Sequence, residues 1–155
     1  MLNDECIKAH VESAKKIQIK VKKKENQVKK LELKPKSYWL AKTQKVFNRY
    51  INLRDKGKPC ISCNSKVEVP HASHYFSVGS SPNLRFNEDN VHTSCVKCNL
   101  HLHGNISEYS IMLPKKIGEE NFNKLISSRS VSKHYHIHEL KELINIYTKK
   151  IKNIN

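Results

Sequence analysis

The chain has 155 residues, of which 29 are Lys or Arg and 14 are Asp or Glu, so its formal net charge is +15. This length suffices for one domain with an appendage but not for two large catalytic domains, and a hydrophobic content of 37% predicts a small core. Neither a membrane span nor a secretory signal is indicated, so we expect a soluble cytoplasmic protein. The excess of positive charge favours a polyanionic partner, since each neutralised phosphate releases counterions; a merely solubilising surface is the alternative.

The positive charge is concentrated at the front of the chain. Residues 1 to 59 hold 17 Lys or Arg and 6 Asp or Glu, whereas residues 60 to 155 hold 12 and 8. The segment from Ile7 to Leu33 has no Gly or Pro, which predicts a long exposed helix. Its heptad seam is broken by polar residues, which argues against a coiled coil. We interpret residues 1–34 as a basic helical arm that binds nucleic-acid phosphates through Lys22, Lys23 and Lys24; a solvated or disordered tail is the alternative.

Further helices are expected on both sides of a cysteine-rich centre. The first runs from about Tyr38 to Arg54, is capped by Ser37 and carries an apolar stripe: Trp39, Thr43, Val46, Phe47, Tyr50 and Ile51. Two shorter helices are predicted over 107–113 and 119–127. A last helix over 137–151 has an apolar face that packs on the centre or on a second subunit. We expect residues 35–113 to form the core domain and residues 114–155 a C-terminal helical region.

Four of the five cysteines form two pairs with the same spacing, Cys60-Ile-Ser-Cys63 and Cys95-Val-Lys-Cys98. A gap of two residues lets both thiolates of a pair face one ion, and two pairs complete the tetrahedral four-sulfur shell that zinc prefers. In a reducing cytosol this spacing is poor evidence for disulfides, and a thioredoxin-like redox site would use one pair. We therefore predict a structural zinc site that contributes folding energy, with Cys6 as a free thiol.

The segment around the second pair presents His74, Asn90 and Asn99 in that order. Alternating residues at 67–69 and 74–76, a turn at 79–82 and a helix from about Val96 predict a hairpin followed by a helix. This order resembles the HNH, or ββα-metal, nucleases. The resemblance implies that the hairpin histidine activates water, that the middle Asn holds the loop orienting it, and that the last Asn binds a divalent ion. The predicted fold class is α+β, with a small zinc-clamped ββα centre, flanking helices and the basic arm.

The chemistry of these side chains suits phosphodiester hydrolysis, which needs a base for water and a cation for the developing charge. His74 can be that base at neutral pH, although an exposed or core-bonded histidine is the alternative. Asn99 offers an amide oxygen acceptable to Mg²⁺ or Mn²⁺, and Asn90 is better suited to orienting than to reacting. His103 lies four residues after Asn99 on the predicted helix, so it is a candidate metal ligand or phosphate contact. Candidate phosphate contacts near the centre are Arg85 and Lys97.

A closer resemblance covers about residues 34 to 152. The motifs that carry it are Lys34-Pro-Lys-Ser-Tyr-Trp39, Pro59-Cys-Ile-Ser-Cys63, His71-Ala-Ser-His74-Tyr75, Leu84-Arg-Phe-Asn-Glu-Asp-Asn90, Cys95-Val-Lys-Cys98-Asn99, Gly104-Asn105 and Glu108-Tyr109. They look like the NinG/Rap recombination proteins of lambdoid phages. The resemblance implies a metal-dependent, structure-selective DNA endonuclease that acts on Holliday junctions and D-loops inside the bacterial host.

The chain departs from the family pattern in two places. Related ββα-metal enzymes often carry an Asp ligand directly before the catalytic His, whereas this chain has Ser73 there and His71 at the position where NinG proteins commonly carry Asp or His. A neutral imidazole in place of a carboxylate weakens Mg²⁺ binding and favours Mn²⁺ or a softer ion. Family members also begin with an additional cysteine-rich finger, of which only Asp4-Glu5-Cys6 resembles the end, so we expect a natural short form or a truncation.

Two other functions fit the sequence. A non-catalytic zinc module that binds DNA and recruits recombination proteins is favoured by Ser73 in place of the usual Asp. RNA binding or processing by the same fold is a further alternative, because a basic arm does not distinguish the two backbones. For the endonuclease, cutting two strands of a junction makes a homodimer economical, with the C-terminal helix as a candidate interface.

Overall fold

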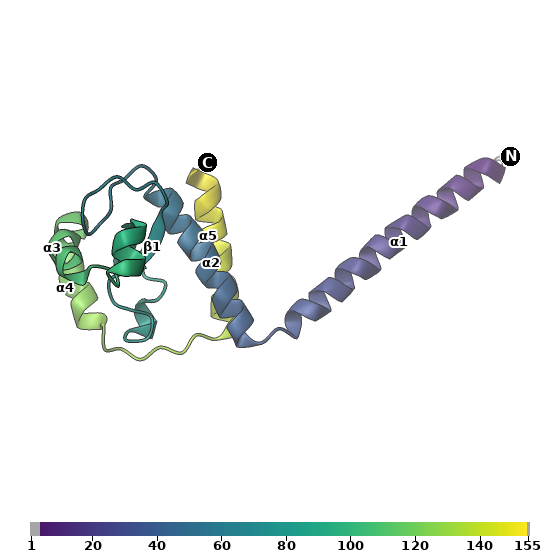
Figure 1. The fold of residues 1–155 in the computed structure, drawn as a ribbon. Coiled ribbons are helices and arrows are strands. Elements are labelled where there is room, and N and C mark those ends of the chain that lie inside the picture. Colours follow the sequence, from purple (N-terminus) through teal and green to yellow (C-terminus); the bar gives the residue numbers. More distant parts are fainter. Residues whose placement is uncertain (1–3, 155) are drawn as a thin grey trace. The chain divides into compact units, whose positions relative to one another are not determined.

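The computed structural model describes the backbone of residues 4–154 and the side chains of residues 8–154. The chain divides into two compact units, the first ending at Tyr38 and the second beginning at Trp39. The first unit contains helix α1 (Asp4–Glu32) and the start of α2 (Lys36–Arg54). The rest of α2 belongs to the second unit, whose strands and further α-helices are β1 (His71–His74), β2 (Val91–Ser94), α3 (Ile106–Ile117), α4 (Glu119–Ser128) and α5 (Ile137–Ile154) (Figure 1). Two 3₁₀ turns, Pro82–Leu84 and Glu88–Asn90, and a π-helical turn, Lys97–His101, lie between these elements.

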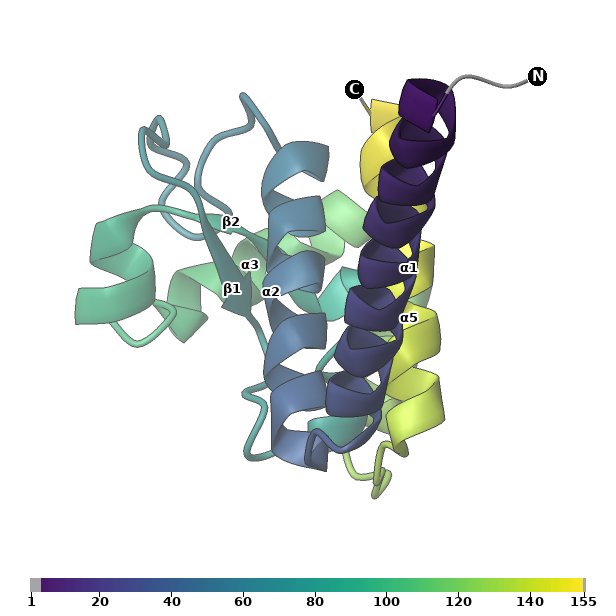
Figure 2. The ribbon, with the colours of Figure 1, turned by 90° about the vertical axis from the view of Figure 1, so that its right-hand side faces the viewer.

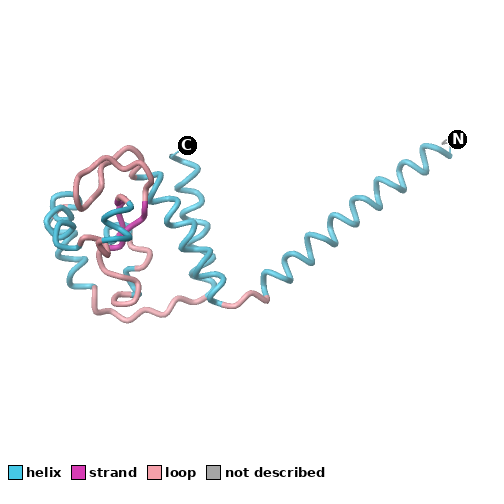
Figure 3. The backbone as a smooth tube through the Cα atoms, in the orientation of Figure 1, coloured by secondary structure: helices cyan, strands magenta, loops and turns pink. Residues whose placement is uncertain are grey.

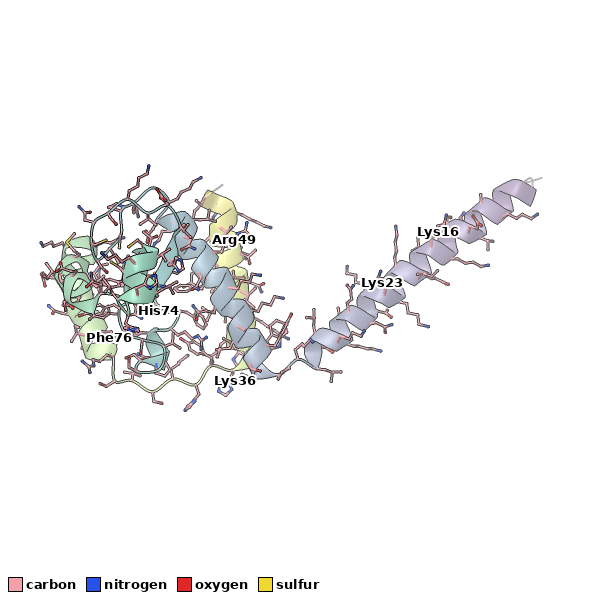
Figure 4. The ribbon with its side chains drawn as sticks, viewed as in Figure 1. Lys16, Lys23, Lys36, Arg49, His74 and Phe76 are labelled. Carbon is pink, nitrogen blue, oxygen red and sulfur yellow. The ribbon has the colours of Figure 1, made fainter. Side chains whose placement is uncertain are left out.

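Helix α1 confirms the long helix predicted for the basic arm. Every side chain described between Lys8 and Ser37 is exposed, including apolar ones such as Val21 and Val28. Figure 4 shows side chains projecting all round this helix, with Lys16 and Lys23 labelled. A helix that buries no apolar face depends on its intrinsic propensity, and Lys, Glu, Gln and Ala supply that propensity here.

Helices α2 and α5 lie side by side and share one apolar core (Figure 2). The predicted stripe of α2 is confirmed, with Trp39, Thr43, Phe47, Tyr50 and Ile51 buried. The Tyr147 ring of α5 lies 4.9 Å from that of Phe47 and 5.1 Å from that of Tyr50. The hydroxyl group of Thr43 donates to the Leu140 carbonyl at 3.2 Å. The apolar face of α5 thus packs on α2 within one chain.

The start of α2 differs from the prediction. The helix begins at Lys36, so Ser37 lies within the first turn and is not its cap. The carbonyl oxygen of Pro35 accepts the Tyr38 amide at 3.1 Å and closes that turn. The three later helices begin within one residue of the positions expected from the sequence and extend one to four residues further.

The predicted hairpin at 67–69 and 74–76 is wrong. The antiparallel strands are β1 and β2, with His71 opposite Ser94 and His74 opposite Val91. They are short, as Figure 3 shows, and a loop over residues 75–90 joins them. Residues 67–69 form no strand. Local alternation pointed to the wrong partner because the true partner of β1 lies beyond this loop, outside the short segment in which periodicity can be recognised.

A second core lies under α3 and α4. Its buried members are Ile61, Leu84, Tyr109, Leu113 and Leu125, flanked by half-buried Tyr75, Phe76, Met112, Ile117 and Phe122. Gly118 has a φ of +84°, which only glycine adopts readily, and it lets the chain turn from α3 into α4. Residues after 114 thus belong to the same compact unit as the cysteine-rich centre.

Candidate functional site

The four paired cysteines converge on one point. The sulfur atoms of Cys60, Cys63, Cys95 and Cys98 all lie within 4.8 Å of one another, and those of Cys63 and Cys95 are 3.8 Å apart. A tetrahedral zinc ion with Zn–S bonds of about 2.3 Å requires sulfur atoms about 3.8 Å apart. The donor set and its spacing therefore fit zinc, as the sequence predicted. Cys6, the predicted free thiol, lies outside the residues whose side chains are described.

Hydrogen bonds tie this cysteine cluster to the rest of the fold. The Ile61 amide donates to the Thr93 carbonyl at 3.0 Å, which fixes the first cysteine pair to β2. Asn105 donates to the Cys98 sulfur at 3.6 Å, which fixes the second pair to the start of α3. Burial raises the pKa of the Cys60 thiol, but hydrogen bonds from backbone groups and from the Ser94 hydroxyl outweigh burial and lower it to about 6. A metal bound here would clamp β2, the turn before it and α3 together.

His74 lies at the end of β1 with its ring held in one orientation. Its Nε2 atom is 3.0 Å from the Arg85 carbonyl oxygen, which can only accept, so Nε2 carries the proton and Nδ1 keeps a lone pair. Burial lowers the pKa of His74, and the positive charge of Arg85 lowers it further, against the carbonyl contact, which raises it. The ring is therefore neutral at pH 7 and has the form that a general base requires. Figure 4 labels His74 on the strand.

Asn90 fastens the loop that carries this carbonyl. Its Oδ1 accepts the Phe76 amide at 2.8 Å, and its Nδ2 donates to the carbonyls of Phe76 at 3.0 Å and Leu84 at 3.1 Å. The side chain is 0% exposed, so both donors and one acceptor are used inside the protein. Asn90 is thus placed to hold the 75–90 loop and not to meet a substrate.

Asn99 meets His71. Its Nδ2 lies 3.3 Å from His71 Nδ1, and both side chains are half-buried. Ser73, where related enzymes place an Asp, is 2% exposed and accepts the Tyr109 hydroxyl through its carbonyl at 3.2 Å. A carboxylate at position 73 would be enclosed on the α3 side of the strand. The structure thus brings together the side chains of Asn99 and His71, two of the residues that were predicted to bind a divalent ion.

The prediction that His103 shares a helical face with Asn99 is wrong. The helix predicted from about Val96 is a single π-helical turn, Lys97–His101, which includes Cys98 and is closed by the Leu102 amide on the Lys97 carbonyl. His103 then has a φ of +49°, so the chain has already turned away from the helix axis. A spacing of four residues aligns side chains only within a continuous α-helix, which ends this argument for His103 as a metal ligand.

The predicted phosphate contacts lie in different parts of the chain. Lys22, Lys23 and Lys24 are exposed on α1. Lys97 is exposed on the π-helical turn between the two cysteines of the second pair. Arg85 is half-buried, because its Nε donates to Gln44 on α2 at 2.8 Å and its guanidinium group lies 5.5 Å from the Phe86 ring.

One buried carboxylate, that of Asp55 next to β2, was not predicted from the sequence. Asp55 accepts hydrogen bonds from Arg54 at 2.7 Å, from Lys58 at 2.9 Å and from the Thr93 amide at 3.2 Å. Burial raises the pKa of this carboxyl group, but Arg54 and Lys58 outweigh burial and hold it far below its usual range. Arg54 also donates to the Val91 carbonyl at 2.8 Å, so Arg54 and Asp55 together fix β2 to the end of α2. The sequence signal that could have indicated it is that Asp55 is the one acidic residue in a turn that also contains Lys56 and Lys58.

Comparisons with known proteins place the chain in a family. A family model described as Bacteriophage Lambda NinG protein matches residues 2–155. Protein ninG of Escherichia phage lambda is 38% identical over 128 residues, which are 82% of this chain and 62% of that protein. Protein ninG of Salmonella phage P22 is 44% identical over 92 residues, which are 59% of this chain and 45% of that protein. No solved structure matches.

The chain spans just under two thirds of the length of the phage lambda relative. Within the described residues, no helix has the length and apolarity needed to cross a membrane. With a match that extends over nearly all of its residues, the chain belongs to the NinG family of lambdoid phages.

Proposed function

We propose that this member of the NinG family is a divalent-metal-dependent DNA endonuclease that acts on branched recombination intermediates in the cytoplasm of the bacterial host. The observation that carries the proposal is the state of His74. A neutral imidazole, fixed through Nε2 by the Arg85 carbonyl, keeps the lone pair of Nδ1 for a proton. In this role Nδ1 takes a proton from the attacking water, and Asn90 holds the loop that keeps the ring aligned.

Asn99 and His71 are the residues that would hold the divalent ion. The ion would supply positive charge for the phosphate and the leaving oxygen. His71 and His74 lie three positions apart on β1. Among the described residues the sheet has two strands, so no described strand pairs with the edge of β1 away from β2. Side chains from both faces of the ribbon can converge on one phosphate at that edge. An imidazole ligand in place of a carboxylate favours Mn²⁺ over Mg²⁺.

The DNA part of the proposal rests on charge and on the resemblance to recombination proteins. The net charge of +15 suits a phosphate backbone, and the exposed lysines of α1 add affinity that is independent of sequence. Branched DNA as the substrate comes from the family resemblance. A homodimer would offer one site to each of the two strands cut at a junction.

Replacement of His74 by Ala tests the catalytic role. On a synthetic four-way junction with Mn²⁺ or Mg²⁺, the variant should bind DNA as tightly as the wild type and cut it at least 100-fold more slowly, the lower end of what a general base contributes. His138→Ala is the matched control, because His138 is exposed on α5 and lies in none of the candidate sites. Full cleavage by the His74 variant would refute the mechanism.

A non-catalytic DNA-binding and recruitment module is the second candidate. Its supporting observation is that, among the described residues, only the four cysteines form a group of three or more His, Cys, Asp or Glu side chains able to hold a metal. Under this alternative the wild type binds junctions with either ion and leaves them intact, and His74→Ala changes nothing.

A further inference from the structure

A cavity of about 630 Å³ lies between the C-terminal half of α2, the turn after it and the segment that leads into β1. Its basic lining residues are Lys45, Arg49, Lys56 and Lys58, and its acidic ones are Asp55 and Glu68. Asp55 already accepts hydrogen bonds from Arg54 and Lys58. The charge available to a ligand is therefore mainly the positive charge of Lys45, Arg49 and Lys56, which is opposed by the negative charge of Glu68. All four side chains are exposed. Figure 4 labels Arg49 on α2.

Two buried polar atoms in this lining have no hydrogen-bond partner among the residues that the structure describes. They are Thr93 Oγ1 and Asn52 Oδ1. Thr93 is 1% exposed, and its neighbours on β2, His92 and Ser94, are also buried. A buried hydroxyl group without a partner costs stability, so its presence on a cavity wall indicates a group that is satisfied when the cavity is filled. The hydroxyl can donate, whereas the amide oxygen can only accept.

The cavity is connected to His74 by a chain of hydrogen bonds. His74 donates to the Arg85 carbonyl at 3.0 Å, Arg85 Nε donates to Gln44 Oε1 at 2.8 Å, and Gln44 Nε2 donates to Asn48 Oδ1 at 2.8 Å. Asn48 lines the cavity, and because its Oδ1 is used its Nδ2 is left as a donor. The chain passes from β1 through the 75–90 loop to α2.

The strand register places the cavity beside His74. Ala72 pairs with Thr93, and His74 pairs with Val91. Paired residues of an antiparallel ribbon project from the same face, and so do residues two positions apart. Thr93 and His74 therefore share a face, at neighbouring positions separated by roughly 7 Å along the strands.

We propose that this cavity binds a phosphate group of a DNA strand that passes beside His74, together with part of the attached nucleotide. Donors for a phosphate come from Arg49, Lys45, Asn48 and the Thr93 hydroxyl. The unpartnered Asn52 oxygen cannot meet a phosphate oxygen, so it takes a donor of the nucleotide, such as a base amino group. A cavity of this volume has the size of known sites for small molecules and cofactors.

Binding of a short fluorescein-labelled single-stranded DNA, measured by anisotropy without added Mg²⁺ or Mn²⁺, tests the proposal. Arg49→Gln should weaken binding about tenfold, as expected for a charge-assisted hydrogen bond, and lower the salt slope by about 0.7. Thr93→Val, which keeps the size of the side chain, should weaken binding about fivefold while the melting temperature stays the same or rises. Lys149→Gln is the matched control, because Lys149 is exposed on α5 and does not line the cavity, and its affinity should stay within twofold of the wild type.

Competition with inorganic phosphate or a mononucleotide distinguishes a phosphate of DNA from a free phosphate as the ligand. Inorganic phosphate should compete only weakly and equally in all variants. Tight binding of free phosphate or a mononucleotide to the wild type, with unchanged DNA affinity in Arg49→Gln and Thr93→Val, would overturn the proposal. The inference rests on the DNA-binding part of the proposed function only. If the variants lose DNA affinity as predicted and no protein cuts junctions, the cavity assignment stands and the endonuclease fails. If the wild type cuts junctions, and both variants bind and cut DNA as the wild type does, the endonuclease stands and the cavity assignment fails.

Discussion

Replacement of Asn90 by Asp changes one nitrogen to an oxygen at the centre of the loop that holds His74. Oδ1 still accepts the Phe76 amide, but the new oxygen faces the carbonyls of Phe76 and Leu84, which Nδ2 contacts at 3.0 and 3.1 Å. Two hydrogen bonds are lost, and a carboxylate is buried against two carbonyl oxygens. The loss should be about 3–5 kcal/mol of the free energy of unfolding, a large part of the stability of a small domain.

The pH dependence identifies the cause. Burial and the facing carbonyls raise the pKa of the introduced carboxyl group, so the destabilisation should be small in acid, where the group is protonated, and grow as the pH rises through that pKa. Urea unfolding of the wild type, Asn90→Asp and the exposed control Asn145→Asp at several pH values measures this. The control should stay within about 0.5 kcal/mol. A loss below 1 kcal/mol at neutral pH for Asn90→Asp would refute the role of Asn90 as the fastening of the loop.

Three further predictions concern the cysteines and the histidines. The Cys95→Ser variant should contain no zinc by elemental analysis, and its cysteine-rich centre should unfold. The Cys6→Ser variant should keep both its zinc and its folded centre. Unchanged zinc content in Cys95→Ser would contradict the four-sulfur site. Burial, followed by the charges of Lys116 and Arg54, lowers the pKa of His92 to about 3. Because the unfolded chain binds a proton that the folded one excludes, stability should fall by about 2 kcal/mol between pH 7 and 5, and His92→Gln should flatten this dependence in urea titrations. Because the pKa of His74 is lowered, the rate of junction cleavage should stay at its maximum as the pH falls to about 6.5. A fall in the cleavage rate with a midpoint above about pH 6.5 would exclude His74 as the base.

The helices and the cluster of four cysteines were predictable because their signals are local. The stripe from Trp39 to Ile51 recurs every three or four residues, and only a helix collects such residues on one side. The spacing of Cys60 with Cys63 and Cys95 with Cys98 follows from the geometry of a metal ion and depends little on the surrounding fold.

The strands and the cavity depend on contacts between distant residues. His71 pairs with Ser94 only after a loop fastened by Asn90, and no periodicity at 67–69 reveals that. The π-helical turn that displaces His103 is a departure from the 3.6-residue period, which sequence arguments assume. The cavity draws on α2, the turn at 55–58, the segment at 67–70 and Thr93, so only the folded chain brings its lining together.

Cleavage of a synthetic four-way junction by the purified wild-type protein tests the central claim most directly. With Mn²⁺ or Mg²⁺, the protein should introduce nicks near the branch point under single-turnover conditions, and omission of the divalent ion should abolish the nicks while binding persists. A junction that is fully bound and remains intact with both ions would contradict the endonuclease and favour the DNA-binding module.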